Sequence, residues 1–175
     1  MGAMQHALAI GLILLGIAAR FAPHPDNVTP LAAIALFGGA YLPKRWAIWL
    51  PVAVIALSDV VIGLHAGVIF TWSAAALIGF VGWWVRRQPS PGRIVRAAIL
   101  SSAVFFLVTN FGVWLLGENG TVYPKTLGGV WACFVAAMPF FRNTLAGDLV
   151  ITTALFGLYG LIIRGAASRQ PVESR

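Results

Sequence analysis

Charged residues are scarce in this chain. Only 10% of its 175 residues are Asp, Glu, Lys or Arg, whereas 59% are hydrophobic. A soluble domain needs more charge than this to cover its surface, and long apolar runs are typical of membrane spans. The composition therefore predicts one integral membrane domain over residues 1–165, followed by a short polar tail, 166–175.

Acidic residues are rarer still, since 5 Asp and Glu stand against 12 Lys and Arg, for a net charge of +7. In a soluble protein this excess would suggest nucleic acid as a partner. Here the cations lie in short loops and near the C-terminus, where they act as topology signals. No basic run interleaved with aromatic residues is present, so nucleic-acid binding is not expected.

Cysteine and catalytic motifs are also lacking. Cys133 is the only cysteine, which excludes an intrachain disulfide. No HExxH, GxSxG or P-loop occurs. The neighbours Ser58 and Asp59 would point in different directions on a helix. We therefore expect neither an enzyme nor a bound cofactor. His24 is a candidate metal ligand, although the histidines and Cys133 do not form a zinc pattern.

Six apolar runs are present, and they predict an all-α bundle with six transmembrane helices. The expected spans are about 4–21, 31–42, 46–64, 68–85, 93–117 and 144–163, with an extra short helix at 127–141. The run 31–42 is short for a full crossing at ~1.5 Å per residue. We expect it to pack inside the bundle, where Gly38 and Gly39 permit close approach. Pro51 predicts a kink in the third span.

The cations predict the orientation of the bundle. Lys44, Arg45, four arginines in 86–96 and three in the C-terminal segment lie on the same side of the predicted spans. The positive-inside rule then places both termini in the cytoplasm, with six crossings of the inner membrane. Trp84 and Arg86 belong to a group that resembles an aromatic and basic anchor at the membrane interface.

Nearly all polar side chains embedded in the apolar runs fall at one depth in this orientation, toward the outer side. The candidate substrate-binding residues are Asn27, Asp59, Asn110, Trp114, Tyr123, Arg142, Asn143 and Asp148. Intramembrane polar residues are costly and by default mark a site or its structural support. Arg142 can bind an anionic or carbonyl group, and asparagine amides can form hydrogen bonds with the polar edge of a heterocycle.

The same residues also allow a structural interpretation. A buried salt bridge of Arg142 with Asp59 or Asp148 would hold the outer loops in place. A bond between Arg142 and Asp148 would need a helix break near residues 139–143, because the two lie six residues apart. The asparagines would then form bonds between helices, and the aromatic residues would belong to an interface belt.

Several stretches together resemble a bacterial family of predicted substrate-binding (S) components of energy-coupling-factor (ECF) transporters. They are "RFAPHPDNVTPLAAIALFGGAYL", "SDVVIG", "TNFGVW", "YPKT" and "PFFRNTLAGDL", within roughly residues 20–157. The resemblance implies a six-helix S-component bundle that binds a vitamin or related micronutrient under loops near the outer face. It also implies a transmembrane T subunit and ATPases as partners. These partners would couple ATP hydrolysis to transport in trans. The other possibility is that the protein transports its substrate without them.

We therefore expect uptake of a vitamin-like micronutrient from the outer side, with segments 22–30 and 117–127 as a lid. A corrinoid, a flavin-like ring, a purine derivative and a thiamin-like compound all suit these residues. A corrinoid is favoured because His24 can coordinate its metal. Two alternatives stay open: a proton-coupled carrier that uses Asp59 or Asp148, and a structural membrane subunit without a ligand.

Overall fold

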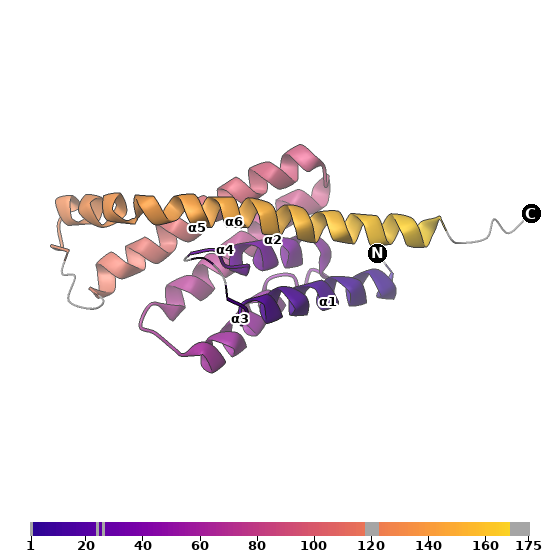
Figure 1. The fold of residues 1–175 in the computed structure, drawn as a ribbon, viewed down its shortest axis with the longest axis horizontal. Coiled ribbons are helices and arrows are strands. Elements are labelled where there is room, and N and C mark those ends of the chain that lie inside the picture. Colours follow the sequence, from indigo (N-terminus) through magenta and orange to yellow (C-terminus); the bar gives the residue numbers. More distant parts are fainter. Residues whose placement is uncertain (1, 24, 26, 118–122, 169–175) are drawn as a thin grey trace, which may run out of the picture.

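The computed structural model describes residues 2–23, 25, 27–117 and 123–168, which form six α-helices and no strand. The helices are α1 (Ala3–Ala19), α2 (Leu31–Tyr41), α3 (Trp49–Ile62), α4 (Val68–Arg87), α5 (Pro91–Leu116) and α6 (Leu127–Ala167). They pack into an elongated bundle, and the hairpin of α5 and α6 extends beyond the other helices at one end (Figure 1). α1 begins and α6 ends toward the opposite end (Figure 1).

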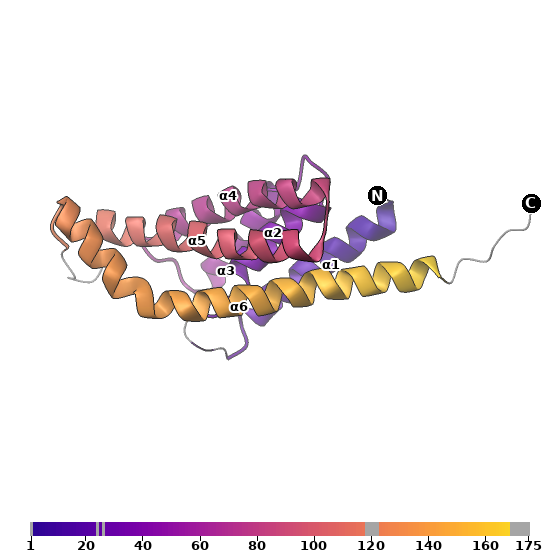
Figure 2. The ribbon, with the colours of Figure 1, turned by 90° about the horizontal axis from the view of Figure 1, so that it is seen from above.

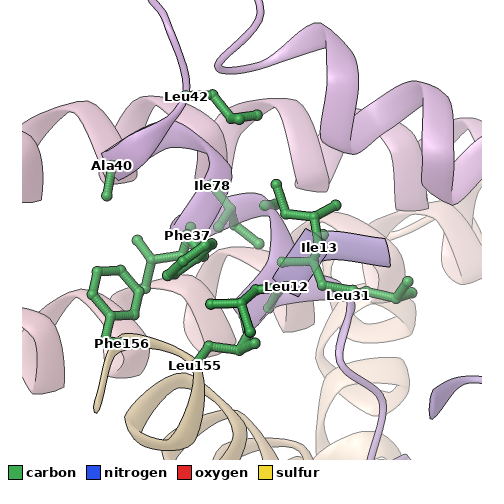
Figure 3. Close-up of a cluster of buried hydrophobic side chains, with 14 of the residues drawn as sticks. Leu12, Ile13, Leu31, Phe37, Ala40, Leu42, Ile78, Leu155 and Phe156 are labelled. Atoms are coloured by element: carbon green, nitrogen blue, oxygen red, sulfur yellow. The ribbon is translucent and has the colours of Figure 1, made fainter. Parts of the chain in front are cut away.

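The short helix α2 lies at the centre of the bundle, as its sequence predicted. Every residue from Leu31 to Ala40 is buried, and α2 contacts all five other helices. Figure 3 shows Phe37 of α2 among side chains from α1, α4 and α6, including Ile13, Ile78 and Phe156. A helix that is apolar on every side is suited to a position where other helices or lipid surround it, and here the other helices do.

Glycines allow α2 and α4 to approach each other closely. A Cβ built on Gly39 would overlap the carbonyl oxygen of Gly79, and one built on Gly82 would overlap the carbonyl oxygen of Leu36. Small residues at such crossings let helix backbones touch, which is a main source of helix association in membranes. The predicted packing role of Gly39 is confirmed.

Three of the six helices, α4, α5 and α6, are long and apolar enough to cross a membrane. The helices α1, α2 and α3 are shorter apolar helices of 17, 11 and 14 residues. Within the expected span at 46–64, the helix begins only at Trp49. The residues before it form turns, in which the backbone N–H groups of Trp46 and Ala47 donate to the carbonyl oxygen of Pro43. Pro51 lies in the first turn of α3, where its missing N–H is not needed, and not at a mid-helix kink.

The last helix, α6, is continuous over 41 residues, so the separate helix predicted at 127–141 is wrong. Thr126 caps its start, because the Thr126 Oγ1 accepts a hydrogen bond from the backbone N–H of Gly129 at 3.2 Å. Pro139 lies inside the helix without ending it. Figure 2 shows that α6 bends in its first half, and a proline within a helix is a common cause of such a bend. The whole segment with Arg142 and Asp148 therefore belongs to one helix.

Arg86, expected at a membrane interface, closes the C-terminal end of α2. Its Nε donates to the carbonyl oxygen of Ala40 at 3.1 Å, and its Nη2 donates to those of Gly39 at 2.7 Å and of Leu42. The last carbonyl groups of a helix have no partner within the helix, and a cation stabilises them. Arg86 therefore has a structural role.

Candidate functional site

Asp59 of α3 lies in a buried network that joins three helices. The Arg20 Nη2, at the end of α1, donates to the Asp59 Oδ1 at 2.7 Å, and the Trp72 Nε1 of α4 donates to the Asp59 Oδ2 at 2.8 Å. Arg20 also donates to the hydroxyl of Ser58. The side chains of Arg20 and Asp59 are 10% and 5% exposed. Both carboxylate oxygens are thus occupied, and the charge is neutralised within the protein.

Arg142, the predicted partner of Asp59, does not form this pair, and Arg20 takes its place. Arg20 ends the first apolar run and Asp59 lies near the outer end of the third, so the predicted depths already matched. The cation also suits its own position, because α1 ends at Arg20 and a helix C-terminus favours positive charge. These two signals in the sequence agree with the pair, but they do not by themselves select Asp59 as the partner of Arg20.

Asp148, midway along α6, is the second buried carboxylate, at 3% exposure. Its Oδ2 accepts a hydrogen bond from the Ser102 Oγ of α5 at 2.7 Å. In the described part of the chain no Lys, Arg or His forms an ion pair with Asp148. The neighbouring positions Ser101 and Thr152 have buried hydroxyl groups that find no hydrogen-bond partner among the described residues. A hydroxyl group, and not a cation, therefore binds this carboxylate.

The proline-rich segment after α1 reaches α6 beside Asp148. A Cβ built on Gly147 would lie 2.9 Å from the Val28 Cγ1, so this segment and α6 are in contact there. The preceding residue, Asn27, is exposed and has φ 62°, in the left-handed region that Asn tolerates better than most residues. The structure thus brings Asn27 and Asp148, two predicted site residues, into one region.

Three further predicted residues lie toward the far end of the α5–α6 hairpin. The Asn110 Nδ2 donates to a carbonyl one turn earlier in its own helix at 2.8 Å. The Trp114 Nε1 donates to the carbonyl oxygen of Pro124 at 3.0 Å, next to the half-buried Tyr123. These bonds attach the segment before α6 to the end of α5. They do not bring Asn110, Trp114 or Tyr123 to Asp148.

Arg142 and Asn143 are exposed on α6, away from Asp148. Six residues of a continuous helix turn the chain by about 600°, so the side chains of Arg142 and Asp148 diverge by about 120°. The expected bond between them is therefore absent. His24 lies outside the described residues, and no group of three or more possible metal ligands occurs within them.

The two buried carboxylates do not share one depth, in contrast to the prediction. The ring of Phe70 on α4 lies against Gly112 on α5, and a short link makes these helices antiparallel. Trp72, which binds Asp59, is therefore nearly level with residue 110 of α5. Ser102, which binds Asp148, lies eight residues away, or roughly 12 Å along the axis. The structure separates two sites where the sequence suggested one.

Two cavities lie apart from all of these residues. One of about 400 Å³ is an apolar groove between α5 and the first turns of α6. The other, of about 610 Å³, lies between the start of α5 and the last third of α6. Neither cavity is lined by a predicted site residue.

The fold and the buried polar groups define a helical protein with segments suited to a membrane. The chain belongs to a family of unknown function, DUF6580, whose model matches residues 3–171. No curated protein and no solved structure matches the chain significantly.

Proposed function

We propose that this chain is a substrate-binding membrane component of the ECF S type, or a transporter that works alone. It would take up a vitamin-like micronutrient from the outer side. Asp148 carries the proposal, because this carboxylate is 3% exposed within a 41-residue apolar helix and no cation among the described residues pairs with it. A polar group so placed is costly, and by default it indicates a functional site.

The surroundings of Asp148 favour a particular kind of substrate. A carboxylate accepts hydrogen bonds, and the hydroxyl groups of Ser102 and Thr152 can donate or accept. A compound with amino groups or a positively charged nitrogen suits such a set, as purine and thiamin-like compounds do. The contact between Val28 and Gly147 supports segment 22–30 as the cover that must move for the substrate to enter.

The proposal includes six crossings with both termini in the cytoplasm of a bacterium. It is supported by α1 beginning and α6 ending toward the same end of the molecule (Figure 1). The ends of α4 and α6 that carry Arg87 and Arg164 fit the cytoplasmic face by the positive-inside rule. A T subunit and ATPases, supplied in trans, would provide the energy for transport by the S-component route.

A proton-coupled carrier is the second candidate, and one observation favours it. Asp59 is paired with Arg20, whereas Asp148 has no cation partner among the described residues. A buried carboxylate without a cation is unfavourable unless it takes up a proton or a positive ligand. Of the two acidic residues considered for proton transfer, Asp148 is therefore the better one.

Co-purification tests the proposal. The protein is produced in rich medium, extracted in detergent, and its bound small molecules are identified by mass spectrometry. We expect a compound at about one molecule per chain in the wild type, and a loss of at least tenfold in Asp148→Asn, because a hydrogen bond to a charged group contributes about 1.5–3 kcal/mol. Arg87→Ala, which removes an exposed cation on α4, is the control and should retain the compound.

Full retention of the compound in Asp148→Asn would refute the assignment of this residue. If neither protein holds a compound, the structural subunit becomes the better explanation. The proton-coupled carrier is distinguished by uptake into cells, which should stop with a protonophore and continue without any ATPase.

A further inference from the structure

The larger cavity, which we call the α5–α6 groove, lies between the beginning of α5 and the last third of α6. Ile94 of α5 and Gly157, Gly160 and Arg164 of α6 line it, and Tyr41 of α2 contributes to its wall. Its volume of about 610 Å³ lies within the range of small-molecule sites. None of the residues assigned to the substrate site takes part in it.

The α5–α6 groove changes from apolar to cationic along α6. Phe156 and Gly157 line the part nearer the middle of the helix, and Arg164 follows two turns later, in the last turn. Because α6 is long and apolar enough to cross a membrane, this direction leads from the bilayer interior to its surface. A phospholipid has the same order, with acyl chains inside and a phosphate at the surface.

The charges around this end of the bundle fit an anionic headgroup. Arg87 ends α4, Arg93 lies in the first turn of α5 against the ring of Trp84 at 5.1 Å, and Arg164 is exposed. The two acidic residues of the described part, Asp59 and Asp148, are buried in other regions. Basic pockets between helices on the cytoplasmic side are suited to anionic lipid headgroups.

The glycines of α6 make room for an acyl chain. A Cβ built on Gly157 or on Gly160 would meet no atom within 4 Å, so these glycines are not required for packing between helices. Glycine costs a helix interior about 1 kcal/mol relative to alanine. Two glycines on the wall of an open groove are therefore consistent with a surface that binds the acyl chain of a lipid.

We propose that the α5–α6 groove binds an anionic phospholipid, with an acyl chain against Phe156 and Gly157 and the phosphate against Arg164. The Tyr41 side chain, on the wall of the groove, offers a hydroxyl that can donate a hydrogen bond to the headgroup. The bound lipid would occupy the junction of α2, α5 and α6 and stabilise the bundle from its Arg-rich end.

The full chain in detergent micelles tests this site with phosphatidylglycerol as the probe. Gly157→Leu adds a side chain at the wall of the groove. Its Cβ meets no atom within 4 Å and the change raises helix propensity, so we expect the variant to fold. Gly165→Leu is the matched control, because Gly165 belongs to the same helix, has equally open surroundings and does not line the groove.

We expect phosphatidylglycerol to raise the melting temperature of the wild type and of Gly165→Leu, and to have no effect on Gly157→Leu. Arg164→Gln should weaken binding about fivefold, the effect of one basic side chain near an anionic surface. Equal stabilisation by phosphatidylcholine would overturn the anionic preference. Equal stabilisation by inorganic phosphate, or an unchanged response of Gly157→Leu, would overturn the lipid site.

Discussion

The two buried carboxylates of this protein have opposite surroundings. Asp59 binds Arg20 and Trp72 with both of its oxygens, whereas Asp148 accepts a hydrogen bond from Ser102 and pairs with no cation among the described residues. Their exposed fractions are nearly equal, at 4% and 3%, so burial alone does not distinguish them. The partners do. A neutralised carboxylate joins helices, and a carboxylate without a cation is available for a ligand or a proton.

Removal of the cation from the Asp59 network should have the largest effect. Arg20→Ala leaves Asp59 buried without its cation, which costs about 3–5 kcal/mol. We expect a much lower melting temperature in detergent. The double variant Arg20→Met with Asp59→Leu should recover most of the loss, because it removes both charges. A loss below about 1 kcal/mol for Arg20→Ala would mean that the pair does not join the helices, contrary to our interpretation.

Removal of one neutral donor from the same carboxylate should have an intermediate effect. Trp72→Phe deletes the indole N–H that donates to the Asp59 Oδ2, and a bond to a charged group contributes about 1.5–3 kcal/mol. Trp83→Phe is the matched control, because the buried Nε1 of Trp83 finds no partner within the described residues. Unfolding of both variants in detergent should show a clear loss only for Trp72→Phe. Equal losses would indicate that ring packing, and not the hydrogen bond, dominates.

Removal of the Thr152 hydroxyl, on the same helix as Asp148, should affect stability least. Thr152→Val removes a buried hydroxyl without a partner in the described part of the chain, so stability should stay the same or rise by about 1 kcal/mol. Ser102→Ala removes the hydrogen bond from Ser102 to Asp148, and it should cost more stability than Thr152→Val.

If Thr152 contacts the substrate, binding of the co-purified compound should fall in Thr152→Val while the melting temperature does not. A large loss of stability would instead assign the Thr152 hydroxyl a structural partner.

The helices were largely predictable because they depend on local properties of the chain. The apolar runs identified five helices to within a few residues and α2 as a buried central helix, with Gly39 at a close crossing. The sixth helix was divided wrongly. Proline at position 139 was interpreted as a break, but the surrounding apolar sequence continues the helix through a bend.

The candidate site was predictable only in part. The sequence marked Asp59 and Asp148 as costly residues in an apolar environment, and both are buried. It did not predict their partners, because Arg20 is 39 residues from Asp59 and Ser102 is 46 residues from Asp148. It also grouped Arg142 with them, although the continuous helix directs that side chain away.

Hydrophobicity, glycine positions and charge placement along the chain determine that this is a helical protein suited to a membrane, because these properties act over a few turns of helix. Only the packing of the helices decides that Asp59 meets Arg20 and Trp72 while Asp148 meets Ser102. That outcome depends on the relative rotation and depth of helices that are distant in the chain.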